Sequence, residues 1–440
     1  MSAKGGEKME IKVTKLKEVM DLMKPVVPRK PTVKSVACLC LGNGKAVATD
    51  LETMVIANFP EAKEQMLLPY SAIAEMLKYV PGNETLQIEL TGKVVTLSWK
   101  EGSARYPTED YLDFPLLPEM AARAEGLIDG DALIAAIQAA LTYVATDTAR
   151  PVLSGVTVVL GTPIEVAAGD GFRMSHQVLG LSFPLEEKVI VPSHGVAILD
   201  HVFKKTPRTP PTTADSLIKV VTAKRQLRMS AIGENKLRLD FGTNASVVIN
   251  LITGKPPEWL ALIPKGEPIL QSQIFAPQLE AAAKRVRTVA KDGSDIVRME
   301  FAEGKLKVSA RGGDQEISTT IDTLNTQGEP GRTALNQSYL LDFVSGKQGI
   351  VIFSKYTDVG PVVFEYQKSP RVLIMPMSVQ WGDEKPAEQP AAVAETPAEA
   401  TDETSDAESD EESDTDAETE SSTEEETAEP ETVEEPTVTE

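Results

Sequence analysis

Ser193, His194 and Asp200 are the residue types of a hydrolase triad, and they fall within one short stretch of the chain. In such a triad the histidine takes a proton from the serine while the carboxylate orients the histidine. Here the serine and the histidine are adjacent at a predicted helix start, and no GxSxG elbow would expose a nucleophile. The spacing therefore argues against acyl transfer.

Two further patterns contain residues that bind phosphates or metals in other proteins. GNGK (42–45) lacks the eight-residue spacing of a phosphate loop and the Ser or Thr that follows its lysine. The histidines His176, His194 and His201 form no metal-binding spacing with neighbouring acids. We therefore expect a protein that is not an enzyme and that uses no metal and no cofactor.

Cys38 and Cys40 lie two residues apart in a strand-like run, so their side chains share one face. A zinc site needs about four ligands, and the sequence has no second cysteine pair. Free cysteines are usually buried, and we interpret these two as small hydrophobic core residues.

One pattern of elements occurs three times along the chain. Each copy has a short β run, a small-residue step and an acid in a turn: KAVATDLE (45–52), IEVAAGDGFR (164–173) and LKVSARGGDQE (306–316). Later in each copy an apolar run leads into a short helix: LLPYSAIAEML (67–77), VIVPSHGVAIL (189–199) and TALNQSYLLDF (333–343). The turn acids are 120 and 144 residues apart, so the repeating unit is a whole domain and not a short solenoid repeat.

Each copy contains two predicted helices and several strands of alternating polarity, which is typical of an α+β domain with helices packed on antiparallel sheets. Asp129 or Asp131 is the expected cap of the helix that opens the second copy. We predict domains at 9–125, 126–265 and 266–382, followed by a tail at 383–440.

The acidic charge of the chain is concentrated in this tail. Residues 383–440 contain 24 Asp or Glu and one Lys, whereas the preceding 382 residues contain 43 basic and 42 acidic residues. The tail has no aromatic residue and no Leu, Ile or Met, so we expect it to be disordered. The nearly neutral body can still carry a basic working surface.

Short motifs along the body are similar to those of one family. They are ATDLE (48–52) and DFPLLPE (113–119) in the first copy; ARPVLSGV (149–156), GDGFRM (169–174) and LITGKPPEWLALIP (251–264) in the second; and NQSYLLDFV (336–344) and VLIMPM (372–377) in the third. In this order and at this spacing, the chain resembles the bacterial DNA polymerase III beta subunit, the replicative sliding clamp, over about residues 9–378.

The resemblance implies a head-to-tail homodimer, a ring of six domains around duplex DNA that is bound without regard to sequence. Clustered basic residues on predicted helices and in the loop 28–34 would contact phosphates. The candidates are Arg29, Lys30, Lys34, Lys78, Arg150, Lys204, Lys205, Lys284 and Arg285. The expected dimer interface contains Arg287, Thr288 and Val289, opposite the second-helix region of the first domain.

The resemblance also implies an apolar pocket between the second and third domains. It would bind short clamp-motif peptides of the DNA polymerase III alpha subunit, the clamp loader and other proteins. Its expected lining is Leu153, Gly171, Phe172, Arg173, Met174, Pro257, Leu262, Leu373, Met375, Pro376 and Met377. We find no signal peptide and no apolar run of about 18 residues, and expect a cytoplasmic, nucleoid-associated protein with no membrane partner.

Three residues depart from the family pattern. Phe172 stands where His is common, Pro256 where an aromatic residue is frequent, and Ser378 where Arg is common. These changes bear on which partners dock. They leave two alternatives open: a peptide-binding scaffold that does not encircle DNA, and a divergent clamp paralogue.

Overall fold

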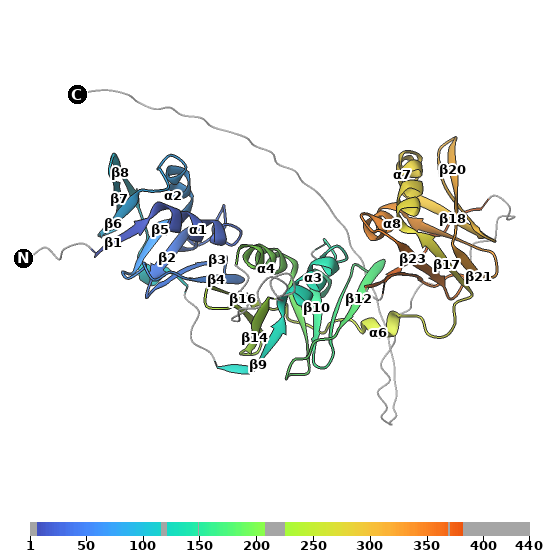
Figure 1. Cartoon of the computed structure of the whole chain (residues 1–440), viewed down its shortest axis with the longest axis horizontal. Coiled ribbons are helices and arrows are strands. Elements are labelled where there is room, and N and C mark those ends of the chain that lie inside the picture. Colours follow the sequence, from blue (N-terminus) through green and yellow to red (C-terminus); the bar gives the residue numbers. More distant parts are fainter. Residues whose placement is uncertain (1–6, 116–120, 148, 207–224, 368–369, 382–440) are drawn as a thin grey trace, which may run out of the picture. The chain divides into compact units, whose positions relative to one another are not determined.

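The structure, a computed structural model, describes residues 7–115, 121–147, 149–206, 225–367 and 370–381 (Figure 1). The predicted tail at 383–440 lies outside the described residues. Residues up to Gln380 form one compact unit. Within it, the elements fall into three successive groups of like composition, which we call the first, second and third groups.

The first group opens with a strand that runs directly into an amphipathic helix. This helix, α1, buries Val13, Leu16, Met20 and Met23 along one side. The strands are β1 (Glu7–Lys12), β2 (Cys38–Gly42), β3 (Lys45–Thr49), β4 (Thr53–Asn58), β5 (Met66–Pro69), β6 (Thr85–Thr91), β7 (Val94–Trp99) and β8 (Gly102–Pro107), and the helices are α1 (Val13–Met23), α2 (Tyr70–Leu77) and the short 3-10 helices η1 (Lys34–Ala37) and η2 (Tyr111–Asp113).

The second group repeats this order. Its first helix is capped by Asp129, whose carboxylate accepts from the N–H of Ala132 at 3.2 Å. Asp131, the other expected cap, instead accepts from the N–H of Arg225. The strands are β9 (Ala122–Asp129), β10 (Gly155–Leu160), β11 (Ile164–Gly169), β12 (Arg173–Leu179), β13 (Glu187–Pro192), β14 (Gln226–Ile232), β15 (Lys236–Phe241) and β16 (Ala245–Asn250), and the helices are α3 (Gly130–Leu141), η3 (Pro151–Leu153), α4 (Ser193–Lys205) and α6 (Trp259–Leu262).

The third group has the longest of these opening helices, with Pro277 in its first turn, where a missing N–H costs nothing. Its second helix is capped by Asn336. The strands are β17 (Leu270–Phe275), β18 (Ile296–Ala302), β19 (Lys305–Gly312), β20 (Gln315–Asp322), β21 (Asn325–Gly328), β22 (Gly331–Asn336), β23 (Ile350–Lys355), β24 (Val362–Tyr366) and β25 (Arg371–Ile374), and the helices are α7 (Ala276–Asp292) and α8 (Gln337–Val344).

The threefold pattern predicted from the sequence is present in these elements. A strand leads into the first helix of each group (β1–α1, β9–α3, β17–α7), and another leads into the second (β5–α2, β13–α4, β22–α8). The predicted turn acids Asp50 and Asp170 each accept from backbone N–H groups two and three residues further on. The predicted α+β class is confirmed.

Two sheets cross from one group to the next. The eight-stranded sheet has the order β5-β2-β3-β4-β16-β15-β14-β9, in which β4 of the first group pairs with β16 of the second. The nine-stranded sheet has the order β13-β10-β11-β12-β25-β24-β23-β17-β21, in which β12 pairs with β25 of the third group. The remaining sheets are β1-β6-β7-β8 and β20-β19-β18-β22. The groups are therefore joined through backbone hydrogen bonds.

Strand pairing bears on the first predicted domain boundary, between residues 125 and 126. That boundary falls inside β9, which pairs with β14 from Ala122 to Asp129. The pairing favours a boundary a few residues earlier. The boundary near 265 falls in the segment between α6 and β17.

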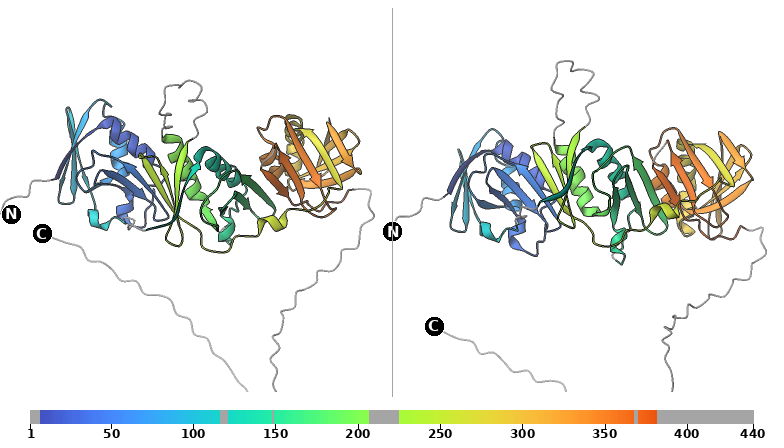
Figure 2. Two further views of the ribbon diagram at one scale, coloured as in Figure 1. Left: turned by 60° about the horizontal axis from the view of Figure 1, so that its bottom comes forward. Right: turned by 90° about the horizontal axis from the view of Figure 1, so that it is seen from below.

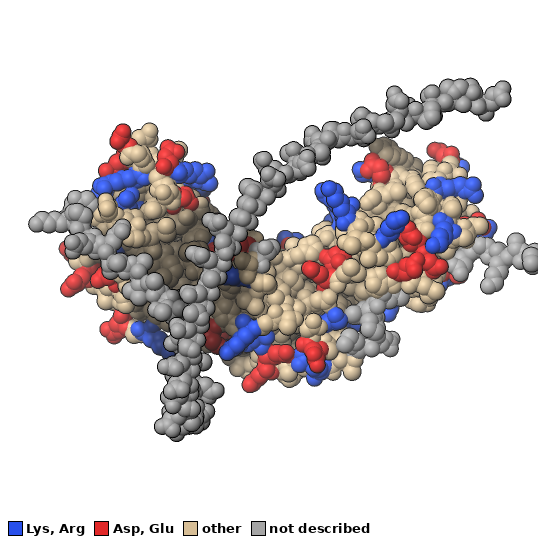
Figure 3. Space-filling model, turned by 180° about the vertical axis from the view of Figure 1, so that it is seen from behind, with Lys and Arg blue, Asp and Glu red and all other residues tan. Residues whose placement is uncertain are grey.

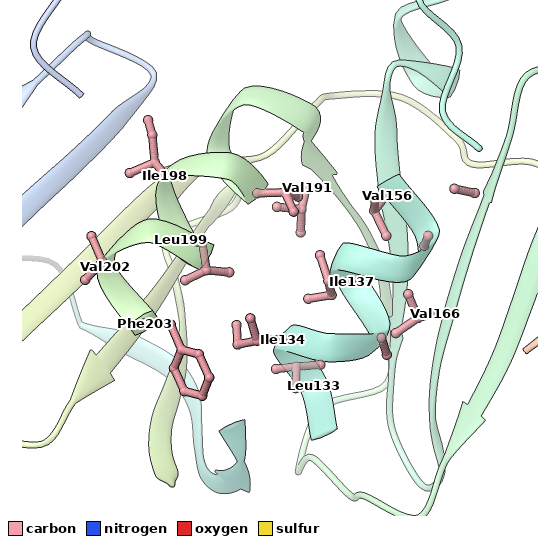
Figure 4. Close-up of a cluster of buried hydrophobic side chains, with 14 of the residues drawn as sticks. Leu133, Ile134, Ile137, Val156, Val166, Val191, Ile198, Leu199, Val202 and Phe203 are labelled. Atoms are coloured by element: carbon pink, nitrogen blue, oxygen red, sulfur yellow. The ribbon is translucent and has the colours of Figure 1, made fainter. Parts of the chain in front are cut away.

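The core lies between the helices and the sheets. In the second group α3 and α4 lie side by side (Figure 2), and apolar side chains from both helices meet those of β10, β11 and β13 (Figure 4). Ile134, Ile137 and Leu199 are almost completely buried there. Full burial of each such side chain stabilises the folded protein by about 1.5–3 kcal/mol. The apolar contact between the two helices and the strands therefore contributes strongly to holding α3 and α4 in place.

Cys38 and Cys40 are buried in a separate apolar cluster with Val47, Met54 and Phe114. Burial raises the pKa of the Cys38 thiol to about 11 and that of Cys40 to about 12. Both therefore stay protonated at neutral pH, as expected of the core residues predicted from the sequence.

Candidate functional site

An apolar cavity of about 410 Å³ opens where the second and third groups meet. Its position follows from the sheet that joins them, because β12 and β25 pair along its edge. The lining comes from the turn before β12, from α6 and from the third group: Gly171, Phe172, Arg173, Met174, Trp259, Ala261, Leu262, Pro361, Leu373 and Met375.

The turn at residues 170–173 forms one wall of the cavity. The Asp170 carboxylate accepts from the N–H groups of Phe172 at 2.9 Å and Arg173 at 3.0 Å, which closes the turn. Gly171 has a φ of +97°, a conformation that glycine adopts without steric cost. The carbonyl of Phe172 accepts from the N–H of Met375 at 2.8 Å, so this wall is tied to the opposite one.

The floor is an apolar cluster of Ala167, Met174, Trp259, Val363 and Leu373. The indole ring of Trp259 lies against the backbone of β11, where a Cβ added at Gly169 would come within 2.8 Å of it. The predicted lining residue Leu153 packs against this cluster and does not line the cavity.

Arg173 is 10% exposed and contacts three elements. Its guanidinium donates to Asp170 at 3.0 Å, to Asp342 of α8 at 2.6 Å and to the carbonyl of Thr142, at the end of α3, at 3.0 Å. It also lies 4.2 Å from the ring centroid of Tyr339. Burial raises the pKa of the Tyr339 hydroxyl, so that ring stays neutral.

Arg150 lies beside Gly171, one of the residues that line the cavity. A Cβ added at Gly171 would come within 2.6 Å of its guanidinium. Arg150 forms an ion pair with Asp147 at 2.8 Å, and this hydrogen bond lowers the pKa of the Asp147 carboxyl. Arg150 is predicted to contact DNA, and in the structure its side chain lies beside the turn that precedes β12.

Most of the predicted pocket residues meet in the cavity, namely Gly171, Phe172, Arg173, Met174, Leu262, Leu373 and Met375. Pro257, Pro376 and Met377 do not line it. Trp259, Ala261 and Pro361 also line the cavity but are not among the predicted lining residues. The first two lie within the family-like segment 251–264.

The predicted DNA-contacting residues fall into two kinds. In the described residues no ion pair involves the exposed Arg29, Lys30 and Lys34, and Arg29 lines a cavity of about 650 Å³ together with Lys24. The others are locally paired or bonded: Lys78 with Glu75, Lys204 with Asp200, Lys205 with Asp21, Lys284 with Glu280 and Arg285 with Thr319. Exposed ion pairs of this kind contribute little free energy, so their basic side chains can leave the acidic partner and bind a phosphate instead. On the face drawn in Figure 3, basic and acidic side chains are interspersed.

The predicted dimer-interface residues lie near the end of α7. Arg287 and Thr288 are exposed, but Val289 is buried in the core of the third group. Val289 lies on the same apolar stripe as Leu279 and Val286, so packing within the chain explains its position. The exposed Arg287 and Thr288 remain the predicted contacts on this part of α7.

The residues that resembled a hydrolase triad are not assembled as one. His194 bonds through Nε2 to Asp50 at 2.8 Å, and Asp200 pairs with Lys204. Among the described residues, no cluster of His, Cys, Asp and Glu side chains could hold a metal ion. No helix in the described ranges is both long and apolar enough to span a membrane.

Residues 261–378 match the model of the DNA polymerase III beta subunit, C-terminal domain. The beta sliding clamp of Caulobacter vibrioides is 24% identical over 392 residues, which cover 84% of this chain and 100% of the relative. A beta sliding clamp homolog of Streptomyces muensis is 26% identical over 337 residues, 72% of this chain and 83% of the relative. The fold is similar to that of the Pseudomonas aeruginosa DNA polymerase III subunit beta bound to griselimycin, with a TM-score of 0.72 and 20% identity over 85% of this chain and 100% of that one.

Proposed function

We infer that this chain is a member of the DNA polymerase III beta subunit family and acts as a beta sliding clamp. In this role it is a non-catalytic processivity factor that keeps a DNA polymerase on duplex DNA. The proposed place of action is replicating DNA in the cytoplasm. Similarity to named clamps along most of the chain and the threefold arrangement of strand–helix units both support this function.

The observation that carries the proposal is the apolar cavity at the junction of the second and third groups. A sliding clamp needs a docking site for its polymerase, and a concave apolar site with few polar groups is suited to a short peptide. The methionines Met174 and Met375 give it adaptable walls. A site of this kind can accept related peptides from several partners, such as the polymerase III alpha subunit and the clamp loader.

The proposed DNA-binding form is a head-to-tail homodimer that closes into a ring. The strands β8 and β20 each end a four-stranded sheet, in the first and third groups respectively. Pairing such strands between two protomers would remove open sheet edges. Arg29, Lys30 and Lys34 are candidates for phosphate contact, which would be independent of base sequence and sensitive to salt.

The docking site can be tested with two methionines that lie two residues apart. Met375 lines the cavity and is 41% exposed, whereas Met377 is 38% exposed and lies outside the lining. We expect Met375→Ala to weaken binding of a polymerase-derived peptide about tenfold, as loss of an anchor contact does. Met377→Ala should change it less than about twofold.

Binding is measured by fluorescence anisotropy with labelled peptides that tile the polymerase III alpha subunit, using the tightest binder as the probe. Sedimentation velocity on both variants checks that their oligomeric state is unchanged. Equal affinity of the two variants for the probe would remove the cavity as the docking site.

A further inference from the structure

Arg173 lies at the cavity, but its polar atoms are engaged elsewhere. Nε bonds to Asp170 in its own turn, Nη1 to Asp342 on α8, and Nη2 to the carbonyl of Thr142. The rings of Tyr339 and Tyr143 flank the guanidinium at 4.2 and 5.3 Å. Three of the five N–H donors of this side chain are therefore engaged within the chain, and each of its three nitrogens already has an acceptor.

These contacts join the two sides of the cavity. Asp170, Phe172 and Arg173 belong to the turn that forms one wall, whereas Asp342 belongs to α8 of the third group. The Phe172 carbonyl is already bonded to the N–H of Met375, which lines the other wall. The Arg173–Asp342 ion pair and this backbone hydrogen bond therefore both connect the second group to the third.

We propose that Arg173 is a positioning residue for peptide docking. Through Asp342 and Thr142 it holds the second and third groups at the separation that makes the cavity, and the peptide contacts the apolar walls. This inference rests on the proposed function, since it assigns a role within the same docking site. Loss of the ion pair with Asp342 would leave the largely buried Arg173 paired only with Asp170 in its own turn, and would let the walls separate.

Asp342 makes the proposal testable because it does not line the cavity. We expect Asp342→Asn to weaken binding of the probe peptide about tenfold, although the residue does not touch the peptide. Arg173→Gln should weaken it by a similar factor, and the double variant should be no weaker than either single one. Arg173→Lys retains a cation opposite Asp342 and should recover part of the loss.

The matched control is Glu316→Gln, which removes another ion pair of the third group, between Arg311 on β19 and Glu316 on β20 at 3.1 Å. It should leave peptide affinity unchanged. Melting temperatures of all variants are recorded, so that binding is compared well below unfolding. If Arg173→Gln does not fold, the partly exposed Asp342→Asn variant decides the question alone.

Wild-type affinity of Asp342→Asn, or losses that add in the double variant, would overturn the positioning role. Failure of the proposed function gives a different outcome, because then no peptide of the tiled set binds the wild-type chain at all.

Discussion

At the scale of single residues, the candidate site depends on a close contact between Gly169 and Trp259. The Trp259 ring forms part of the floor and packs on the backbone of β11, where there is no room for a methyl group. A Cβ at Gly169 would also come within 2.9 Å of the carbonyl of Arg173. The glycine is therefore needed for packing, and its backbone lies outside the left-handed region.

Substitution of two glycines tests this contact. We expect Gly169→Ala to destabilise the protein by about 1–3 kcal/mol through overpacking, and to weaken peptide binding because the floor must move. Gly180→Ala is the control, because a Cβ there meets nothing within 4 Å. It should be neutral or stabilising by up to about 1 kcal/mol. Melting temperatures that fall equally in both variants would contradict the packing argument.

The sequence predicted residues in motifs better than residues brought in by packing. The turn acids Asp50 and Asp170 and the cavity residues around Phe172 follow from local patterns that the structure contains. Pro361 reaches the cavity only because β24 and β25 place its loop there, and no short motif encodes that approach. Arg150 is predicted as a DNA contact within the family resemblance, and only the tertiary structure shows that it lies beside Gly171.

At the scale of elements, helices and strands recur in the order predicted from three weakly similar segments. The two helices of each group are predictable because apolar residues at helical spacing follow a strand, as in α3 and α4. The short helix α6 is not among the predicted elements. The joined sheets were not predictable, since the pairing of β4 with β16 and of β12 with β25 is set by contacts far apart in the chain. The second of these pairings brings together the walls of the cavity.

The end of α2 offers an element-scale test of the proposed dimer. Tyr79 follows this helix and is 81% exposed, so its ring is available to a second protomer. We expect Tyr79→Asp to raise the dimer dissociation constant at least about tenfold, because burying a tyrosine at an interface contributes strongly to affinity.

The control for this variant is Leu112→Asp in η2, since Leu112 is 87% exposed in the same group of elements. Sedimentation velocity across a dilution series gives both dissociation constants. If Leu112→Asp and Tyr79→Asp dissociate alike, the interface does not include the end of α2.

At the scale of the whole molecule, the proposed clamp would have to hold DNA without reading its sequence. Its 43 basic and 42 acidic residues nearly cancel before the acidic segment 383–440 begins. Attraction to phosphates must then come from the local distribution of charge. The candidates are Arg29, Lys30 and Lys34, which are exposed and form no ion pair within the part of the chain that the structure describes. Weak contacts of this kind suffice for a clamp only if a closed ring keeps the protein on the DNA.

Closure of the ring is therefore the most direct test of the proposed function, and negative-stain electron microscopy of the purified full-length protein examines it. The account predicts two-fold particles with six similar lobes around a hole wide enough for duplex DNA. Compact or open particles without a hole, at a concentration where sedimentation shows a dimer, would contradict it and favour a peptide-binding scaffold that does not encircle DNA.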